Sequence, residues 1–227
     1  MSKRPASKVK FLSGQEQFKL EPKTQAQKIY LTNLYNDDVC AAIGSPGTGK
    51  TFISCAYAAQ QLLRNNFEKI VITRPVVSMG KSNGFVKGDL NEKCLPWMLP
   101  MIGVFNLVMG KGAVDCNIRN ENIIMQPMEM IRGMSYDRTI VIVDEAQNCT
   151  ISELKAISTR VGEHSQLILM GDPSQNDLKG KSGLDQFSDI CIKHHIPGFS
   201  SVKFTHQDIV RSGLVKSLVI AFEKESI

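Results

Sequence analysis

A glycine-rich run that ends in lysine and threonine carries the clearest chemistry in the sequence. Residues 44–51 read GSPGTGKT and match the pattern GxxxxGK[ST] in full, between an apolar run and a stretch with helical periodicity. Glycines let the backbone amides of such a loop point inward at an anion, and the helix start adds partial positive charge. A glycine-rich turn with a surface lysine is the alternative. We expect a phosphate loop formed by Gly44, Ser45, Pro46, Gly47, Thr48, Gly49, Lys50 and Thr51.

Each end of this loop has an expected task. Lys50 should reach the β- and γ-phosphates of a nucleotide, and the Thr51 hydroxyl should ligate Mg²⁺. Two adjacent acids, Asp144 and Glu145, directly follow the apolar run TIVIV further along the chain. Because ligands of parallel sheets bind at the carboxyl ends of the strands, these acids should lie beside the phosphate loop.

The acid pair predicts hydrolysis rather than phosphate transfer to another substrate. We expect Asp144 to hold Mg²⁺ through a water, and Glu145 to orient or deprotonate the attacking water. A kinase needs no water activator, and the sequence also lacks a recognisable lid with paired arginines. It contains no NKxD-type guanine signature either, which favours ATP over GTP.

Apolar runs alternating with helical stretches must position these residues. Strands are predicted at residues 39–43, 69–73, 139–143, 166–170 and 201–204, and helices at 24–36, 50–64, 152–161 and 207–223. Such an alternation predicts an α/β fold, with a mostly parallel sheet and helices on both faces. Residues 76–114 interrupt it with a glycine-containing loop and then an apolar stretch expected to be helical. Connections of this length tend to be functional or to make interfaces.

Composition limits the chain to one ordinary domain. Its 227 residues suffice for a single hydrophobic core, and we expect residues 1–20 to form a basic, mobile N-terminal segment ahead of a single P-loop ATPase domain at residues 21–227. The net charge of +5 is compatible with nucleic-acid binding, but equally with a mildly basic globular protein.

Cysteine usage and hydropathy predict a cytoplasmic protein. None of the six cysteines forms a CxxC pair, so we expect free thiols; Cys191, His194 and His195 are the only local metal-like group and lack a second set of ligands. No signal peptide is visible at the start of the chain. The most apolar stretch, residues 95–109, is shorter than the roughly 20 residues that span a bilayer.

Further motifs accompany the loop and the acid pair in a specific order. They are PKTQAQ at 22–27, RPVV at 74–77 followed by Gly84-Phe85, MIRG at 130–133, DEAQN at 144–148, TRVG at 159–162, GDPSQNDL at 171–178 and DIVR at 208–211. In this combination the chain resembles the PhoH-like proteins, P-loop ATPases with a core like that of superfamily 1 helicases. The resemblance implies a RecA-like P-loop NTPase fold with ATP and Mg²⁺ as ligands. The run GFVKGDL at 84–90 departs from the family, which usually shows Leu-Pro before the second glycine.

The resemblance also implies roles for single polar residues. Gln27 is similar to the glutamine that reads the adenine edge, a task that suits an amide because it donates and accepts at once. Gln175 resembles the residue that senses the γ-phosphate or the attacking water. Arg74 follows a strand and could contact nucleic acid or phosphate, or equally form a structural salt bridge.

Arg211 is the candidate for stabilising the charge of the transition state. Superfamily 1 helicases supply such an arginine from a second core domain, for which the sequence after Arg211 leaves no room. We therefore expect Arg211 to act within its own subunit or in a neighbour, with a surface salt bridge as the alternative. Action on a neighbour requires head-to-tail contacts, which close into a ring. PhoH-like proteins are thought of as ring-forming, so the resemblance predicts a homo-oligomeric ring, a hexamer.

Two functions of different classes follow. The first is an ATP-driven, helicase-like motor or remodeller of RNA or single-stranded DNA, favoured mostly by the resemblance. It predicts a groove lined by basic residues such as Lys81, Lys87, Arg132, Lys179 and Lys181. The second is a nucleotide-gated regulatory or assembly ATPase that acts on a protein partner without nucleic acid.

Overall fold

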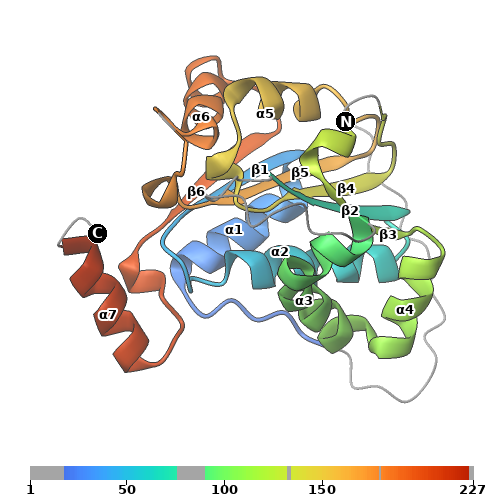
Figure 1. Ribbon diagram of the computed structural model, residues 1–227, viewed down its shortest axis with the longest axis horizontal. Coiled ribbons are helices and arrows are strands. Elements are labelled where there is room, and N and C mark those ends of the chain that lie inside the picture. Colours follow the sequence, from blue (N-terminus) through green and yellow to red (C-terminus); the bar gives the residue numbers. More distant parts are fainter. Residues whose placement is uncertain (1–17, 76–89, 132–133, 179, 225–227) are drawn as a thin grey trace.

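A six-stranded sheet in the order β3-β2-β4-β5-β1-β6 lies at the centre of the molecule (Figure 1). The computed structural model describes residues 18–75, 90–131, 134–178 and 180–224. Every strand pair in the sheet is parallel. The strands are β1 (Val39–Gly44), β2 (Lys69–Arg74), β3 (Ile123–Pro127), β4 (Thr139–Val143), β5 (Gln166–Gly171) and β6 (Phe199–Phe204).

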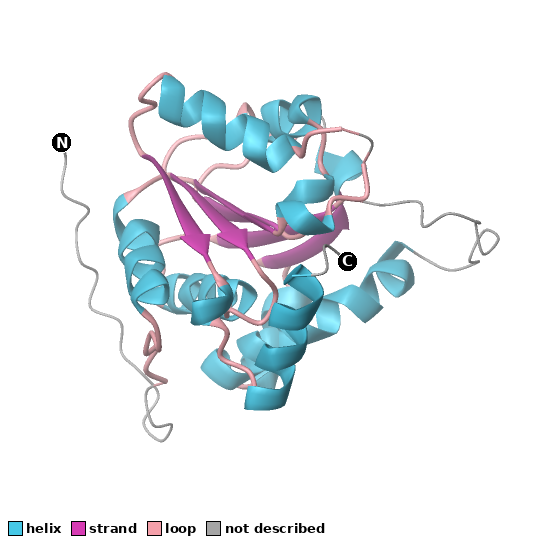
Figure 2. Cartoon of the chain, turned by 90° about the vertical axis from the view of Figure 1, so that its left-hand side faces the viewer, coloured by secondary structure: helices cyan, strands magenta, loops and turns pink. Residues whose placement is uncertain are grey.

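Helices cover both faces of this sheet (Figure 2). One face packs against α1 (Gln25–Asn36), α2 (Lys50–Leu63), α3 (Leu90–Met109) and α4 (Lys111–Arg119), and the other against α5 (Ile151–Ser158) and α6 (Gly183–Lys193). Alternate residues of each strand enter the two cores: Ile140 and Ile142 of β4 face the first layer, and Val141 and Val143 the second. Burial on both faces explains why these strands read as continuous apolar runs.

The sequence predicted most of these elements. Strands β1, β2, β4 and β5 and helices α1, α2 and α5 lie within a few residues of the expected ranges, and the apolar part of the long connection is helical, as α3 and α4. Two elements were missed. Strand β3 is a short edge strand that pairs only with β2, and α6 is an amphipathic helix between β5 and β6.

The helix predicted at residues 207–223 was wrong in its first part. A short 3-10 helix, η4 (His206–Asp208), comes first, and α7 starts only at Gly213 and runs to Lys224. Thr205 and Asp208 form a capping box around η4, and Ile209 then has an extended backbone. This local hydrogen bonding separates η4 from α7. In Figure 1, α7 projects away from both helical layers.

The α3 and α4 layer includes the most apolar part of the chain. Within the described ranges no single helix is long and apolar enough to cross a membrane, although the bent pair Trp97–Met109 and Lys111–Arg119 passes together on length and composition. Met101 and Phe105 of α3 are buried in the core beneath the sheet. Residues 1–17 of the predicted N-terminal segment and the predicted loop at 76–89 lie outside the described residues.

Candidate functional site

A cavity of 480 Å³ opens at the carboxyl ends of β1, β4 and β5. Its volume is in the range of small-ligand sites. Most of the residues predicted from the sequence line it: Gln27, Pro46, Gly47, Thr48, Gly49, Lys50, Thr51, Asp144, Glu145, Gln175 and Arg211. Gly44 and Ser45 are not part of the lining; they contribute through their backbone. Glu21, Lys23, Phe52, Asp172 and Val210 also line the cavity and were not predicted.

The phosphate loop has the backbone geometry that its glycines predict. Gly44, Gly47 and Gly49 all have positive φ, at 136°, 76° and 87°. A Cβ on Gly44 would lie 1.9 Å from the Phe204 carbonyl oxygen of the neighbouring strand β6, so only glycine fits there. Gly49 caps the start of α2, and the helix N-terminus therefore faces the cavity.

The ammonium group of Lys50 is held against the loop itself. Its Nζ donates to the carbonyl oxygens of Gly44 (2.6 Å) and Ser45 (2.8 Å) and lies 3.3 Å from the Thr48 hydroxyl. Burial lowers the pKa of Lys50, while the negative charges of Asp172, Glu145 and Asp144 oppose this shift. Lys50 is therefore a partly desolvated cation facing three carboxyl groups.

The two predicted acids follow β4 directly and differ in environment. Burial, and next the charge of Glu145, raise the pKa of Asp144 to about 6, while Arg74 and Lys50 oppose this shift. Glu145 has a left-handed backbone (φ 51°, ψ 37°), which a residue with a side chain rarely adopts. Strain of this kind costs on the order of 1–3 kcal/mol and clusters at functional sites.

A buried amide that sequence reasoning did not single out links this acid to the next strand. Gln147 donates from Nε2 to Oε2 of Glu145 (2.6 Å), and its Oε1 accepts from the backbone N–H of Asp172 (3.0 Å). The nearby Asn148 bonds Asp177 twice, through the backbone N–H and the carboxylate of Asp177. The signal available in the sequence was an amide pair, QN, shortly after a buried strand. Apart from Glu145, the bonding partners of these two amides lie 25 or more residues away.

Gln27 lies in the cavity with its amide already engaged. Its Nε2 donates to the Thr48 carbonyl (2.9 Å), and its Oε1 accepts from the Lys23 N–H (2.6 Å). A Cβ on Gly49 would approach Nε2 of Gln27 to 2.8 Å. One amide hydrogen and one oxygen lone pair remain for a nucleotide base. Adenine reading by Gln27 stays a prediction, and the observed bonds fix the amide beside the loop.

The segment after β5 brings Gln175 to the same sheet edge. Asp172 accepts from both the N–H and the hydroxyl of Ser174, and its carbonyl accepts from the Gln175 N–H (2.9 Å). This places the 3-10 helix η3 (Pro173–Gln175) at the cavity, with the Gln175 side chain exposed in the lining. The role of Gln175 as a γ-phosphate sensor stays a prediction.

Arg211 lies against the phosphate loop of its own chain. A Cβ on Gly47 would be 2.9 Å from Cγ of Arg211, and the Val210 N–H donates to the Gly47 carbonyl (3.0 Å). The segment between η4 and α7 is thereby tied to the loop. Among the described residues, no hydrogen bond or ion pair of the Arg211 guanidinium is observed, so the surface salt bridge gains no support.

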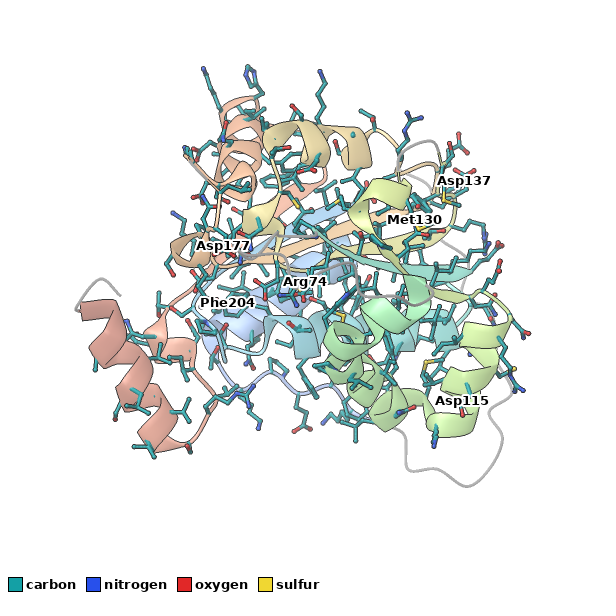
Figure 3. The ribbon with its side chains drawn as sticks, viewed as in Figure 1. Arg74, Asp115, Met130, Asp137, Asp177 and Phe204 are labelled. Carbon is teal, nitrogen blue, oxygen red and sulfur yellow. The ribbon has the colours of Figure 1, made fainter. Side chains whose placement is uncertain are left out.

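Arg74 forms an ion pair inside the site. It lies in the middle of the molecule in Figure 3, and its guanidinium is 3.6 Å from Oε1 of Glu145. Of the five basic residues predicted to line a groove, Lys81, Lys87, Arg132 and Lys179 lie outside the described residues. Lys181 is exposed and pairs with Asp189.

The donor set of the cavity fits a small divalent cation. Thr51 and Asp144, both in the lining, offer oxygen ligands, and Mg²⁺ takes few protein oxygens and completes its shell with phosphates and waters. The raised pKa of Asp144 reflects buried negative charge that a cation would offset. No group of three or more His, Cys, Asp or Glu side chains suited to a metal occurs in the part of the chain that the structure describes.

Comparison with solved structures agrees with this fold. The large terminase of a thermophilic bacteriophage superposes with a TM-score of 0.51 at 13% sequence identity, covering 87% of this chain and 50% of the terminase. An identity this low bears on the fold alone. The parallel sheet with a phosphate loop after β1 and an acid pair after β4 is that of a RecA-like P-loop NTPase.

Comparison of sequences finds relatives with much higher identity than these structures. It is 36% identical to a PhoH-like protein of Bacillus subtilis over 206 residues, 90% of this chain and 64% of that protein. It is 35% identical to a PhoH-like protein of Synechocystis over 204 residues, 89% of this chain and 62% of that protein. The chain thus spans less than two thirds of the length of these relatives. The model of the PhoH-like protein family matches residues 19–223, and the chain belongs to this family.

Proposed function

We propose that the protein is a cytoplasmic, Mg²⁺-dependent ATPase. One observation carries the proposal: Lys50, Thr51, Asp144, Glu145, Gln175 and Arg211, which come from distant parts of the sequence, line one nucleotide-sized cavity at the phosphate loop. Any Mg²⁺ would be held by Thr51 and Asp144 and would supply charge neutralisation at the phosphates. Lys50 would bind the β- and γ-phosphates, and Glu145 would orient the attacking water and accept its proton.

Arg211 is proposed to stabilise the transition state within its own subunit. Its contact with the loop residue Gly47 supports this alternative over action on a neighbour. An arginine at this place would meet the charge that develops on the transferred phosphoryl group. The Gln27 amide, held beside the loop, is proposed to contribute to the recognition of adenine.

The proposed polymer is RNA or single-stranded DNA, bound by a helicase-like core. Support comes from the resemblance of the motifs to those of PhoH-like proteins, whereas the candidate contact Arg74 is paired with Glu145. Binding that neutralises phosphates weakens steeply with salt. The decisive experiment is steady-state ATP hydrolysis with Mg²⁺ or with EDTA, with and without each polymer, at low and moderate salt. Several-fold stimulation by a polymer supports a motor, and no hydrolysis with Mg²⁺ contradicts the ATPase itself.

A regulatory or assembly ATPase that acts on a protein partner is the second candidate, favoured by the surface of α7. This projecting helix and the residue before Arg211 expose the apolar side chains of Val210, Leu214, Val215 and Leu218. Such a face suits contact with protein, either a partner or a second copy in the hexameric ring that the resemblance predicts. Hydrolysis that no polymer changes, together with a higher mass by light scattering that Leu214→Lys abolishes, would favour this candidate.

A further inference from the structure

Gln147 is a buried amide whose functional groups all contact the catalytic edge of the sheet. Its side chain is 1% exposed. The Nε2 group donates to Glu145 at 2.6 Å and lies 3.5 Å from the Gln175 carbonyl, while Oε1 accepts from the Asp172 N–H at 3.0 Å. A single side chain thus joins the acid after β4 to the turn after β5. It does not line the cavity itself.

The surroundings hold this amide in one position. A Cβ on Gly171, the last residue of β5, would lie 2.4 Å from Oε1 of Gln147 and 2.9 Å from its backbone nitrogen. Only glycine at this position leaves space for the Gln147 side chain. The Ser182 hydroxyl donates to the Gln147 carbonyl (3.1 Å) from the start of α6. Because Gln147 is buried, water cannot replace these bonds without a cost.

The bond to Glu145 is the short and directional one on that carboxylate. On the other oxygen, Arg74 lies at 3.6 Å, beyond hydrogen-bond distance. A bond to an ionised acceptor is stronger than one between neutral groups. Glu145 also has a left-handed backbone, which orients its side chain differently from that of an extended residue. The direction of its carboxylate therefore depends on Gln147.

We propose that Gln147 is the positioning residue for Glu145 and couples it to the turn at residues 172–175. This inference rests on the proposed hydrolysis of ATP, in which Glu145 orients water. Gln175 sits at the end of that turn and lines the cavity, so a displacement of the turn by the γ-phosphate is transmitted through the amide to the Glu145 carboxylate. The water-orienting group and the group beside the phosphate then move together.

The test uses Gln147→Met, which keeps the length of the side chain and removes both hydrogen-bonding functions. We expect kcat for ATP to fall about tenfold or more, with KM and the Kd for a fluorescent ATP analogue changed less than about twofold. In Gln147→Asn, which keeps the amide but is one methylene too short, kcat should fall similarly. Hydrogen exchange at the Asp172 amide, which loses its acceptor, should become faster in both variants without nucleotide.

Gln166→Met is the matched control. Gln166 is also buried, and it donates to the carbonyls of Leu34 and Asp37 at the opposite end of the sheet. Its replacement should lower the melting temperature and leave kcat within about twofold. The coupling is overturned if the wild type hydrolyses ATP and both Gln147 variants fold and retain the wild-type kcat. It is also overturned if Gln166→Met lowers kcat as much as the Gln147 variants do. A wild type that does not hydrolyse ATP would instead contradict the proposed function, and the inference with it.

Discussion

Strands β2 and β4 lie side by side and carry an arginine–glutamate pair at each end. At the amino ends, Arg138 Nε and Glu68 Oε1 are 2.6 Å apart, and both side chains are about half exposed. At the carboxyl ends, Arg74 and Glu145 are 3.6 Å apart and less exposed. The Arg138 and Glu68 pair is therefore both the shorter and the more solvent-exposed of the two. It lies at the end of the sheet away from the cavity.

The difference shows that the length of an ion pair says little about its purpose. Water screens the Arg138 and Glu68 pair, and exposed pairs contribute roughly 0–1 kcal/mol to stability. The Arg74 and Glu145 pair lies among Asp144, Gln147 and Lys50, where burial shifts pKa values and every polar contact changes the charge near the cavity. The pair at the amino ends is thus a solvent-exposed one, and the pair at the carboxyl ends lies beside the cavity where we propose that ATP is hydrolysed.

Replacing the glutamate of each pair should give the largest difference in kcat between the two ends of the strands. Glu145→Gln should reduce kcat for ATP by a factor on the order of 100 or more, because the amide cannot accept a proton from water. Glu68→Gln removes a glutamate paired in the same way and should leave kcat unchanged. Steady-state phosphate release measures both. Equal kcat in the two variants would contradict a role for Glu145 in accepting a proton from water.

The buried Asp144 at the carboxyl end should make the free energy of unfolding depend on pH. Its folded-state pKa, about 6, is raised above the usual value of 3.8, so the folded state favours the protonated acid. Without nucleotide, the free energy of unfolding should therefore fall as the pH rises from about 4 to 6, by on the order of 2 kcal/mol. Asp144→Asn should recover that stability at pH 7 while abolishing hydrolysis. Urea unfolding at both pH values measures this, with the exposed Asp115→Asn as control (Figure 3).

The two arginines should give the smallest effects. Arg74→Gln should lower kcat about fivefold, the equivalent of ~1 kcal/mol in the barrier, because the Glu145 carboxylate loses one of its two partners. Arg138→Gln should change neither kcat nor KM and cost about 0.5 kcal/mol of stability, an amount that high salt removes. A salt-insensitive loss of turnover in Arg138→Gln would contradict the division between the two ends.

Residues of the candidate site that belong to local sequence patterns could be predicted, whereas residues that act through contacts between distant segments could not. The phosphate loop could be recognised because glycines, lysine and threonine at set spacing dictate one backbone path between strand and helix, and Asp144 and Glu145 because they follow a run buried on both faces. Gln147 was missed because it bonds Asp172 and Gln175, residues far along the chain that the sheet brings beside it. No periodicity encodes that contact.

The fold shows the same limit. Strand β3 escaped prediction because an edge strand is only half-buried and its apolar run is short. The end of the last predicted helix was correct, but its beginning was not, because the capping box of Thr205 and Asp208 creates a separate turn. The contact of Arg211 with its own loop depends on the segment between this turn and α7.

The order of the strands sets a distance scale for the site. Strand β5 lies between β1 and β4, so the phosphate loop and the acid pair are separated by two strand spacings, roughly 9–10 Å. On adjacent strands the same two backbone segments would lie only one strand spacing apart, about 5 Å. The intervening strand β5 keeps the backbones of the phosphate loop and the acid pair apart, and the cavity opens at the carboxyl ends of these strands. The separation of the two backbone segments is thus set by the order of strand pairing.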